Sequence, residues 1–405
     1  MDDRQLFLAA LAAAIRGEAV KWDGLCDAES WQNLHLLAGS HRVGSLILEA
    51  VYRCPDFIMA EDSLKTVWKR EAMQSSAAQA VRDAAFSECY GRMVDSGLHP
   101  LVMKGSVCRS LYPDGGLRPS SDEDLLVQAE EFAEAVRFLR GRGMTLLDPQ
   151  ADVETAFEIG FTSPDGLYIE LHRSPFSPDS AAMEQCNRFF SDAHSRAVSV
   201  NGLLSMCPQD HMLYLLLHAY KHFVHSGFGL RQVCDIALWA QNYGAQINWP
   251  QLWMQCEEVR CKKFAQTVFS VARAHLGFDA QMAGVELEPD LPVQALLDDL
   301  LDAGAFGSSS GNRVHSATVT LNAVESSRRG EKQSLLRSAF PKRSDLVGRY
   351  SYLRRYPVLL PVAWCSRLGR YALETARAKR DNSPAESLAL GRKRTDLLRQ
   401  LDLID

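Results

Sequence analysis

The chain has 405 residues, of which 46% are apolar, enough for two or three globular domains with sizeable cores. Its formal net charge of −6 disfavours nucleic acid as a partner, because such binding draws mainly on lysine and arginine pairing with phosphates. Its uninterrupted apolar runs are shorter than the ~20 residues that a membrane span needs, and its first residues lack the basic-then-apolar order of a secretory signal. The ten cysteines form no Cys-x-x-Cys pair, the spacing expected of a zinc site or a redox motif. These features predict a cytoplasmic protein.

The first element in chain order is a helical N-terminal region, which we expect to span residues 1–95. It is rich in alanine and leucine, and its apolar residues recur at helical spacing, as in Leu36, Val43, Ile47 and Val51.

A strand, a tight turn and a helix are predicted next. The short apolar stretch 101–103 ends in Lys104, Gly105 and Ser106 and leads into 107–112. Glycine at a strand-to-helix turn lets the backbone approach a phosphate, and the free N–H groups at a helix start can bind it. The serine hydroxyl adds a donor, and the lysine is a further candidate for contact with a phosphate.

The turn at 113–116, Pro-Asp-Gly-Gly, separates this helix from a second predicted strand at 122–127. Successive side chains of a strand point to opposite faces. Asp122 and Asp124 therefore share one face, whereas Glu123 points to the other. A charge on that packed face should lie at a frayed strand start or have a basic partner.

A helix and a β-hairpin follow. The spacing of apolar residues predicts a helix at about 130–142, and strands at 157–162 and 167–173 flank the turn Ser-Pro-Asp-Gly at 163–166. In the second strand Glu170 shares a face with Tyr168 and His172.

Three carboxylates on adjacent strands, Asp122, Asp124 and Glu170, suit Mg²⁺, which prefers oxygen ligands. One ion would be held by carboxylates and triphosphate oxygens, and a second would activate an attacking hydroxyl. Glu170 would complete the second site or accept the proton of the acceptor hydroxyl. His172, on the same face as Glu170, would help align the acceptor or be an ordinary polar residue at a strand end.

Residues 201–300 are predicted to form a second helical domain. His218 and His222 are four residues apart and so share a helical face, where they would bind a metal or the triphosphate, or simply pack. Lys221 would reach phosphate or stay solvated.

Three further charged residues have structural alternatives. Arg118 precedes the acidic strand and would lie near the triphosphate or clamp its loop. Arg231 and Asp235 have the spacing of an ion pair within one helix, for which we expect a structural role.

The remainder of the chain is less regular. A small, polar stretch predicts a flexible loop or linker at 301–342. A C-terminal helical segment is expected at 343–405, in which the apolar run 356–364 is flanked by arginines. Peripheral membrane contact is the less favoured reading of this short run, and ordinary packing the favoured one. With a catalytic core at 96–200, the expected organisation has five parts.

The central region combines four motifs: Lys104-Gly105-Ser106, Leu111-Tyr112-Pro113, Leu117-Arg118 and Asp122-x-Asp124-Leu-Leu-Val127. With these motifs it resembles the bacterial uncharacterised nucleotidyltransferase family of the DNA polymerase β superfamily, over roughly residues 34–253. Glu170, in Ile-Glu-Leu-His-Arg, matches the third acid of the superfamily. The spacing from Ser106 to Asp122 is longer than in the superfamily's commonest form, and Glu123 replaces an apolar residue.

The resemblance implies an α+β fold, in which a small mixed β-sheet nucleotidyltransferase core is embedded between helical regions. It also implies Mg²⁺-dependent transfer of a nucleoside monophosphate from a nucleoside triphosphate such as ATP to a hydroxyl or similar acceptor, with release of pyrophosphate. The acceptor would be a small molecule, a glycan precursor, a peptide or a protein. The alternative is a catalytically silent nucleotide-binding or scaffold protein.

Overall fold

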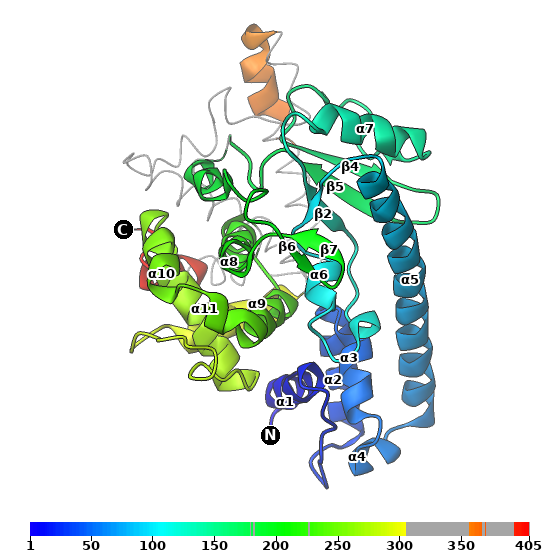
Figure 1. The fold of residues 1–405 in the computed structure, drawn as a ribbon. Coiled ribbons are helices and arrows are strands. Elements are labelled where there is room, and N and C mark those ends of the chain that lie inside the picture. The colour runs from blue at the N-terminus through cyan, green and yellow to red at the C-terminus, as the bar shows by residue number, and fades with distance from the viewer. Residues whose placement is uncertain are drawn as a thin grey trace.

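The computed structural model describes most of the chain, namely residues 1–178, 180, 183–225, 227–304, 356–366, 369 and 393–404. Within them helices surround a five-stranded mixed sheet and a separate two-stranded sheet (Figure 1). The predicted fold class, an α+β protein with a small mixed sheet between helical regions, is confirmed.

Five helices make up the N-terminal part: α1 (Asp3–Ile15), α2 (Ala28–Ser40), α3 (Gly44–Val51), α4 (Pro55–Ile58) and α5 (Asp62–Asp95). Asp2 caps α1 because its side chain accepts from the Gln5 N–H, and the Gln5 side chain accepts from the Asp2 N–H. Aromatic rings hold the helices together, since the Phe57 ring lies 5.0 Å from that of Trp31 and 5.9 Å from that of Trp68. The predicted helical N-terminal layer is therefore present, and α5 runs from it along the side of the molecule to the sheet (Figure 1).

The main sheet has the strand order β1-β2-β5-β4-β3. Its strands are β1 (Leu101–Val102), β2 (Glu123–Leu126), β3 (Thr145–Leu146), β4 (Glu158–Thr162) and β5 (Tyr168–His172). Only β2 and β5 pair in parallel, and the other neighbours are antiparallel. The predicted hairpin is confirmed as β4 and β5. The helix expected at 107–112 is shorter, since α6 covers Ser106–Arg109, and the 3₁₀ turn Gly115–Leu117 follows.

The helix expected near 130–142 is α7 (Phe132–Gly141). A small hairpin of β6 (Val198–Val200) and β7 (Leu203–Ser205) was not predicted, and it is tied to β1 because the Ser205 hydroxyl donates to the Val102 carbonyl at 2.8 Å. Short, irregular strands of this kind carry little periodic signal.

The second helical part comprises α8 (Pro208–His225), α9 (Leu230–Tyr243), α10 (Trp249–Glu258), α11 (Lys262–His275) and α12 (Val293–Ala303). In Figure 1, α8 to α11 lie on the other side of the sheet from α5. The sheet thus has one face toward α8.

The expected linker at 301–342 lies outside the described residues except for 301–304, where α12 ends. The C-terminal segment expected at 343–405 is described only at 356–366, 369 and 393–404. In the apolar run, Tyr356, Val358 and Val362 are exposed. Among the described residues, no helix is both long and apolar enough to cross a membrane.

Candidate active site

Two acidic residues meet where β2 and β5 run in parallel. Asp124 lies directly opposite Glu170 in the strand register, and neighbouring strands are about 4.8 Å apart. Asp122 directly precedes β2. The alternation expected for β2 is confirmed by Lys104, whose Nζ lies 3.4 Å from Asp122 Oδ2 and 3.1 Å from Asp124 Oδ2.

Lys104 is an internal cation of this cluster. Burial alone would lower the pKa of its ammonium, but Asp122 and Asp124 raise it above its ordinary value. Burial would likewise raise the pKa of Asp124, whereas Lys104 and His172 hold it well below its usual range. The cluster therefore keeps Asp124 ionised and Lys104 charged at neutral pH.

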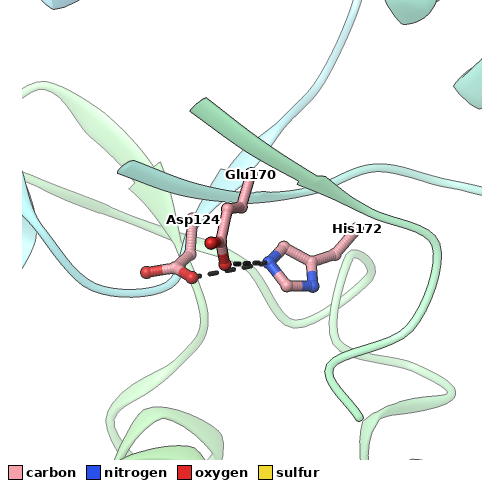
Figure 2. A group of neighbouring side chains, drawn as sticks. All are labelled: Asp124, Glu170 and His172. Carbon is pink, nitrogen blue, oxygen red and sulfur yellow. Dashed lines mark ion pairs between the residues drawn. The ribbon is translucent and has the colours of Figure 1, made fainter. Parts of the chain in front are cut away.

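His172 ends β5 beside the same carboxylates. Its Nε2 lies 3.4 Å from Asp124 Oδ1 and 3.7 Å from Glu170 Oε2, while its Nδ1 lies 3.8 Å from Glu158 Oε2. Burial lowers the pKa of the imidazole, but the contacts with Asp124 and Glu170 raise it by a larger amount. The resulting pKa is about 9. Figure 2 shows the ring facing both carboxylates.

Glu170 is also fixed from its own strand. The Tyr168 hydroxyl donates to Glu170 Oε1 at 2.7 Å, an arrangement that strand alternation permits because the two residues share a face. The opposite residue on β4 is Gly160, where a Cβ would come within 2.9 Å of the Tyr168 ring and hydroxyl. Glycine at this position gives the tyrosine room to reach the carboxylate.

A polar pocket of about 170 Å³ contains this cluster. Its walls come from the sheet and from α8, and the lining residues are Lys104, Asp122, Asp124, Glu158, Glu170, His172, Pro175, Tyr214, His218, Lys221 and His222. The two α8 histidines share a face, as expected, with 3.3 Å between their Nε2 atoms. Burial and nearby positive charge hold the pKa of His218 well below its usual range. Eight of the predicted site residues are thus brought together.

The Gly105–Ser106 turn does not line this pocket. The turn was expected to offer a free backbone N–H to a phosphate, but the Ser106 N–H donates to Glu123 Oε2 at 2.8 Å. Gly105 has φ 55°, and a Cβ there would overlap the same carboxylate. The basic partner expected for Glu123 is Arg109, whose Nη2 donates to Oε1 at 2.6 Å. Burial nevertheless raises the pKa of Glu123.

Arg118 is also absent from the pocket lining. It is buried and forms an ion pair with Asp235 of α9, and Tyr112 donates to the same carboxylate at 2.8 Å. The expected pair within α9 is therefore wrong, since Arg231 instead donates to the carbonyl of Pro119. Arg118, from the loop before β2, pairs with Asp235 of α9, and Arg231 of α9 bonds the backbone of that same loop. Both fasten the loop before β2 to α9, so the loop-clamping alternative fits Arg118.

Three residues of the pocket have the donor set and spacing of a metal site. One ligand atom each from Asp124, Glu170 and His172 lies within 4.8 Å of the others. Asp122, which was expected in this group, lies at the Lys104 side instead and is partly exposed, at 22% of its side chain. Buried ring nitrogens of His172 without hydrogen-bond partners in the described part of the chain fit a divalent cation. Sequence reasoning placed His172 beside the acceptor and did not foresee it as a candidate ligand.

A mixed sheet that presents acidic side chains from two parallel neighbours, between helical regions, is consistent with a nucleotidyltransferase-like core. The chain matches the model of the family described as uncharacterised nucleotidyltransferase over residues 27–277, and it belongs to that family. No curated protein and no solved structure matches it. Membership supports transferase activity in general and a nucleotide as substrate.

Proposed function

We propose that the chain is a Mg²⁺-dependent nucleotidyltransferase that moves a nucleoside monophosphate from a triphosphate to a hydroxyl or similar acceptor. The observation that carries this proposal is the parallel register of Asp124 with Glu170 in a polar pocket. An ionised carboxylate kept in a buried site is a common feature of catalytic centres.

In this proposal Asp122 and Asp124 hold the metal, and Glu170 completes a second site or accepts the proton of the acceptor hydroxyl. Bound Mg²⁺, with two ions expected, would stabilise the charge that develops on the transferred phosphoryl group and activate the acceptor oxygen. Tyr168 orients Glu170 through its hydrogen bond. Lys104 balances the charge of the aspartates and, as a lining residue of the pocket, would contact a bound phosphate.

The triphosphate is assigned to the α8 wall. His218, Lys221 and His222 line the pocket opposite the carboxylates, and lysine and histidine are ordinary phosphate contacts. The Gly105–Ser106 turn is a weaker candidate, because its N–H already binds a carboxylate. The pocket of about 170 Å³ is smaller than the roughly 300–1,000 Å³ of whole-ligand sites. It suits the phosphates and leaves the base outside.

The acceptor is a small molecule, a glycan precursor, a peptide or a protein, since the acidic net charge disfavours RNA. We place the reaction in the cytoplasm, as the sequence predicts. Peripheral membrane contact through the exposed apolar side chains near residue 358 stays the less favoured reading.

The test compares the thermal stability of wild type and Asp124→Asn with each nucleoside triphosphate, with and without Mg²⁺. Ligand at about 100 times its Kd stabilises the folded state by roughly 2.7 kcal/mol. We expect a Mg²⁺-dependent shift for at least one triphosphate that Asp124→Asn loses. If no triphosphate shifts the wild type, the silent scaffold becomes the better account, with Lys104 serving as a permanent counter-ion of the aspartates.

A further inference from the structure

His172 is a buried polar side chain that faces three carboxylates, Asp124, Glu170 and Glu158, at 3.4, 3.7 and 3.8 Å. Its side chain is only 3% exposed, and neither ring nitrogen makes a hydrogen bond to any residue that the structure describes. Buried polar atoms are almost always hydrogen-bonded, so each exception calls for a partner. The ring stands at the wall of the pocket with Nε2 toward Asp124 and Glu170 (Figure 2).

The distances around Nε2 lie within the range that separates ligands of one metal ion. Two ligand atoms at about 2.1 Å from an ion are separated by about 3.0 Å when adjacent and by about 4.2 Å when opposite. The distances from His172 Nε2, 3.4 Å to Asp124 Oδ1 and 3.7 Å to Glu170 Oε2, fall between these limits. Small side-chain adjustments, with release of the imidazolium proton to solvent, would therefore suffice for all three to bind one ion.

The two oxygens of Asp124 face different neighbours. Oδ2 lies near Lys104, at 3.1 Å, and Oδ1 faces His172. A cation on the Oδ1 side can therefore bind without displacing the lysine. On the far side of the ring, Nδ1 is 3.8 Å from Glu158 Oε2, and a carboxylate at the second nitrogen is the usual support of a metal-bound histidine.

We infer that His172 is a metal ligand together with Asp124 and Glu170, and that this site binds Mn²⁺ more tightly than Mg²⁺. Mg²⁺ prefers oxygen ligands and keeps its waters, whereas an imidazole shifts a site toward first-row transition metals. The inference deepens the proposed function and rests on it, since it adds His172 to the carboxylates of the second metal site, Asp124 and Glu170, and gives the metal preference of that site.

The experiment uses the full chain loaded with Mn²⁺ alone and records pulsed electron paramagnetic resonance, which detects the nuclear spin of a coordinated imidazole nitrogen. The wild type should show this nitrogen coupling, and titration should give a Kd for Mn²⁺ at least about tenfold lower than for Mg²⁺. His172→Gln should lose the coupling and bind Mn²⁺ about tenfold more weakly. His222→Gln removes another pocket imidazole and should keep the coupling.

Coupling that persists in His172→Gln, or bound Mn²⁺ without any nitrogen coupling in the wild type, would overturn the ligand assignment and leave the proposed function standing. If neither cation binds, with or without a triphosphate, the proposed function itself fails. If His172→Gln does not fold, the ligand can be identified in another way. Wild type is labelled with ¹⁵N-histidine, and the measurement is repeated on His218→Gln and His222→Gln. The coupling must then come from histidine and survive both changes, and its loss in either one would overturn the assignment.

Discussion

Two buried carboxylates in this protein, Asp124 and Asp235, have opposite surroundings. Asp235 accepts hydrogen bonds from the Tyr112 hydroxyl and from two nitrogens of Arg118, and it does not line the pocket. Asp124 instead forms ion pairs with Lys104 at 3.1 Å and His172 at 3.4 Å, and its Oδ2 meets the geometry of a hydrogen bond with no residue in the described part of the chain.

The difference separates a structural carboxylate from one prepared for a ligand. A fully bonded buried network rigidifies what it joins, here the loop before β2 and helix α9. A buried group whose bonding is incomplete, at the wall of a pocket and between opposite charges, is a candidate for binding and catalysis. The experiments below test whether the two aspartates really differ in this way.

The largest effect is expected at Asp124. Asp124→Asn should lower pyrophosphate release from the preferred triphosphate by about 10³-fold or more, because metal stabilisation of the transition state is worth several kcal/mol. The variant should stay folded in urea titrations. Turnover close to that of the wild type would place catalysis elsewhere.

Arg118→Met should act on stability instead. Removing one partner of a buried ion pair costs about 3–5 kcal/mol, because Asp235 is left charged and unpaired. Urea unfolding measures the loss, and Mn²⁺ affinity of the folded fraction should not change. The matched control is Arg118→Met with Asp235→Leu, which should recover part of the stability. A single variant as stable as wild type would show that this network is dispensable.

Two buried histidines should make the stability of the metal-free protein fall at opposite ends of the pH range, in an alkaline limb and an acidic limb of the stability curve. The folded pKa of His172 is raised to about 9, so its contribution to stability is full below its unfolded value near 6.5 and is lost as pH rises through 9. Burial lowers the pKa of His211, stacked 3.8 Å from Trp239, to about 3. The unfolded chain then binds the extra proton, and stability falls as pH drops from 6.5 toward 3.

The alkaline limb is worth about 3.5 kcal/mol at most and the contribution of His211 to the acidic limb about 5 kcal/mol, since one pKa unit corresponds to about 1.4 kcal/mol and the pKa moves from 6.5 to about 9 and to about 3. Urea unfolding between pH 4 and 9 measures them. His172→Gln should flatten the alkaline limb alone, whereas His211→Gln should reduce the acidic limb, to which His41 and His218 also contribute because burial lowers the pKa of both. An alkaline limb unchanged in His172→Gln would contradict the charged imidazole.

The smallest effect is expected at the α8 wall. Lys221→Gln should weaken the triphosphate about tenfold, which equals about 1.4 kcal/mol, and should leave the monophosphate almost unaffected. Isothermal titration in the presence of Mg²⁺ measures both. Lys69→Gln, on α5, is the matched control for loss of one positive charge. Equal weakening in the two variants would indicate only a long-range effect of net charge.

Local patterns in the sequence predicted much of the fold. The turn 163–166 and the strands around it identified the β4–β5 hairpin, and helical spacing identified α7 and the helical character of 201–300, because these signals depend on neighbours along the chain. The alternation of Asp122 and Asp124 with Glu123 was likewise sufficient to separate the two faces of β2.

Contacts between distant residues were beyond such patterns. Sequence spacing suggested that Asp235 pairs with Arg231, whereas the preferred partner, Arg118, comes from a loop far back in the chain. The register of Asp124 with Glu170 and the approach of Lys104 also depend on tertiary packing. The burial of Glu123 against Arg109 followed the one available signal, the cost of an unpaired buried charge.

The parallel pairing of β2 with β5 also bears on how the protein folds. Asp124 and Glu170 belong to strands separated in the chain by α7, β3 and β4. Such non-local pairing forms slowly, because the chain loses the entropy of closing a long loop before the contacts between the strands stabilise it. During synthesis, a chain that has emerged from the ribosome only as far as β2 contains Asp124 but not yet Glu170. Divalent ions should therefore slow unfolding much more than they speed folding, since their ligands assemble late.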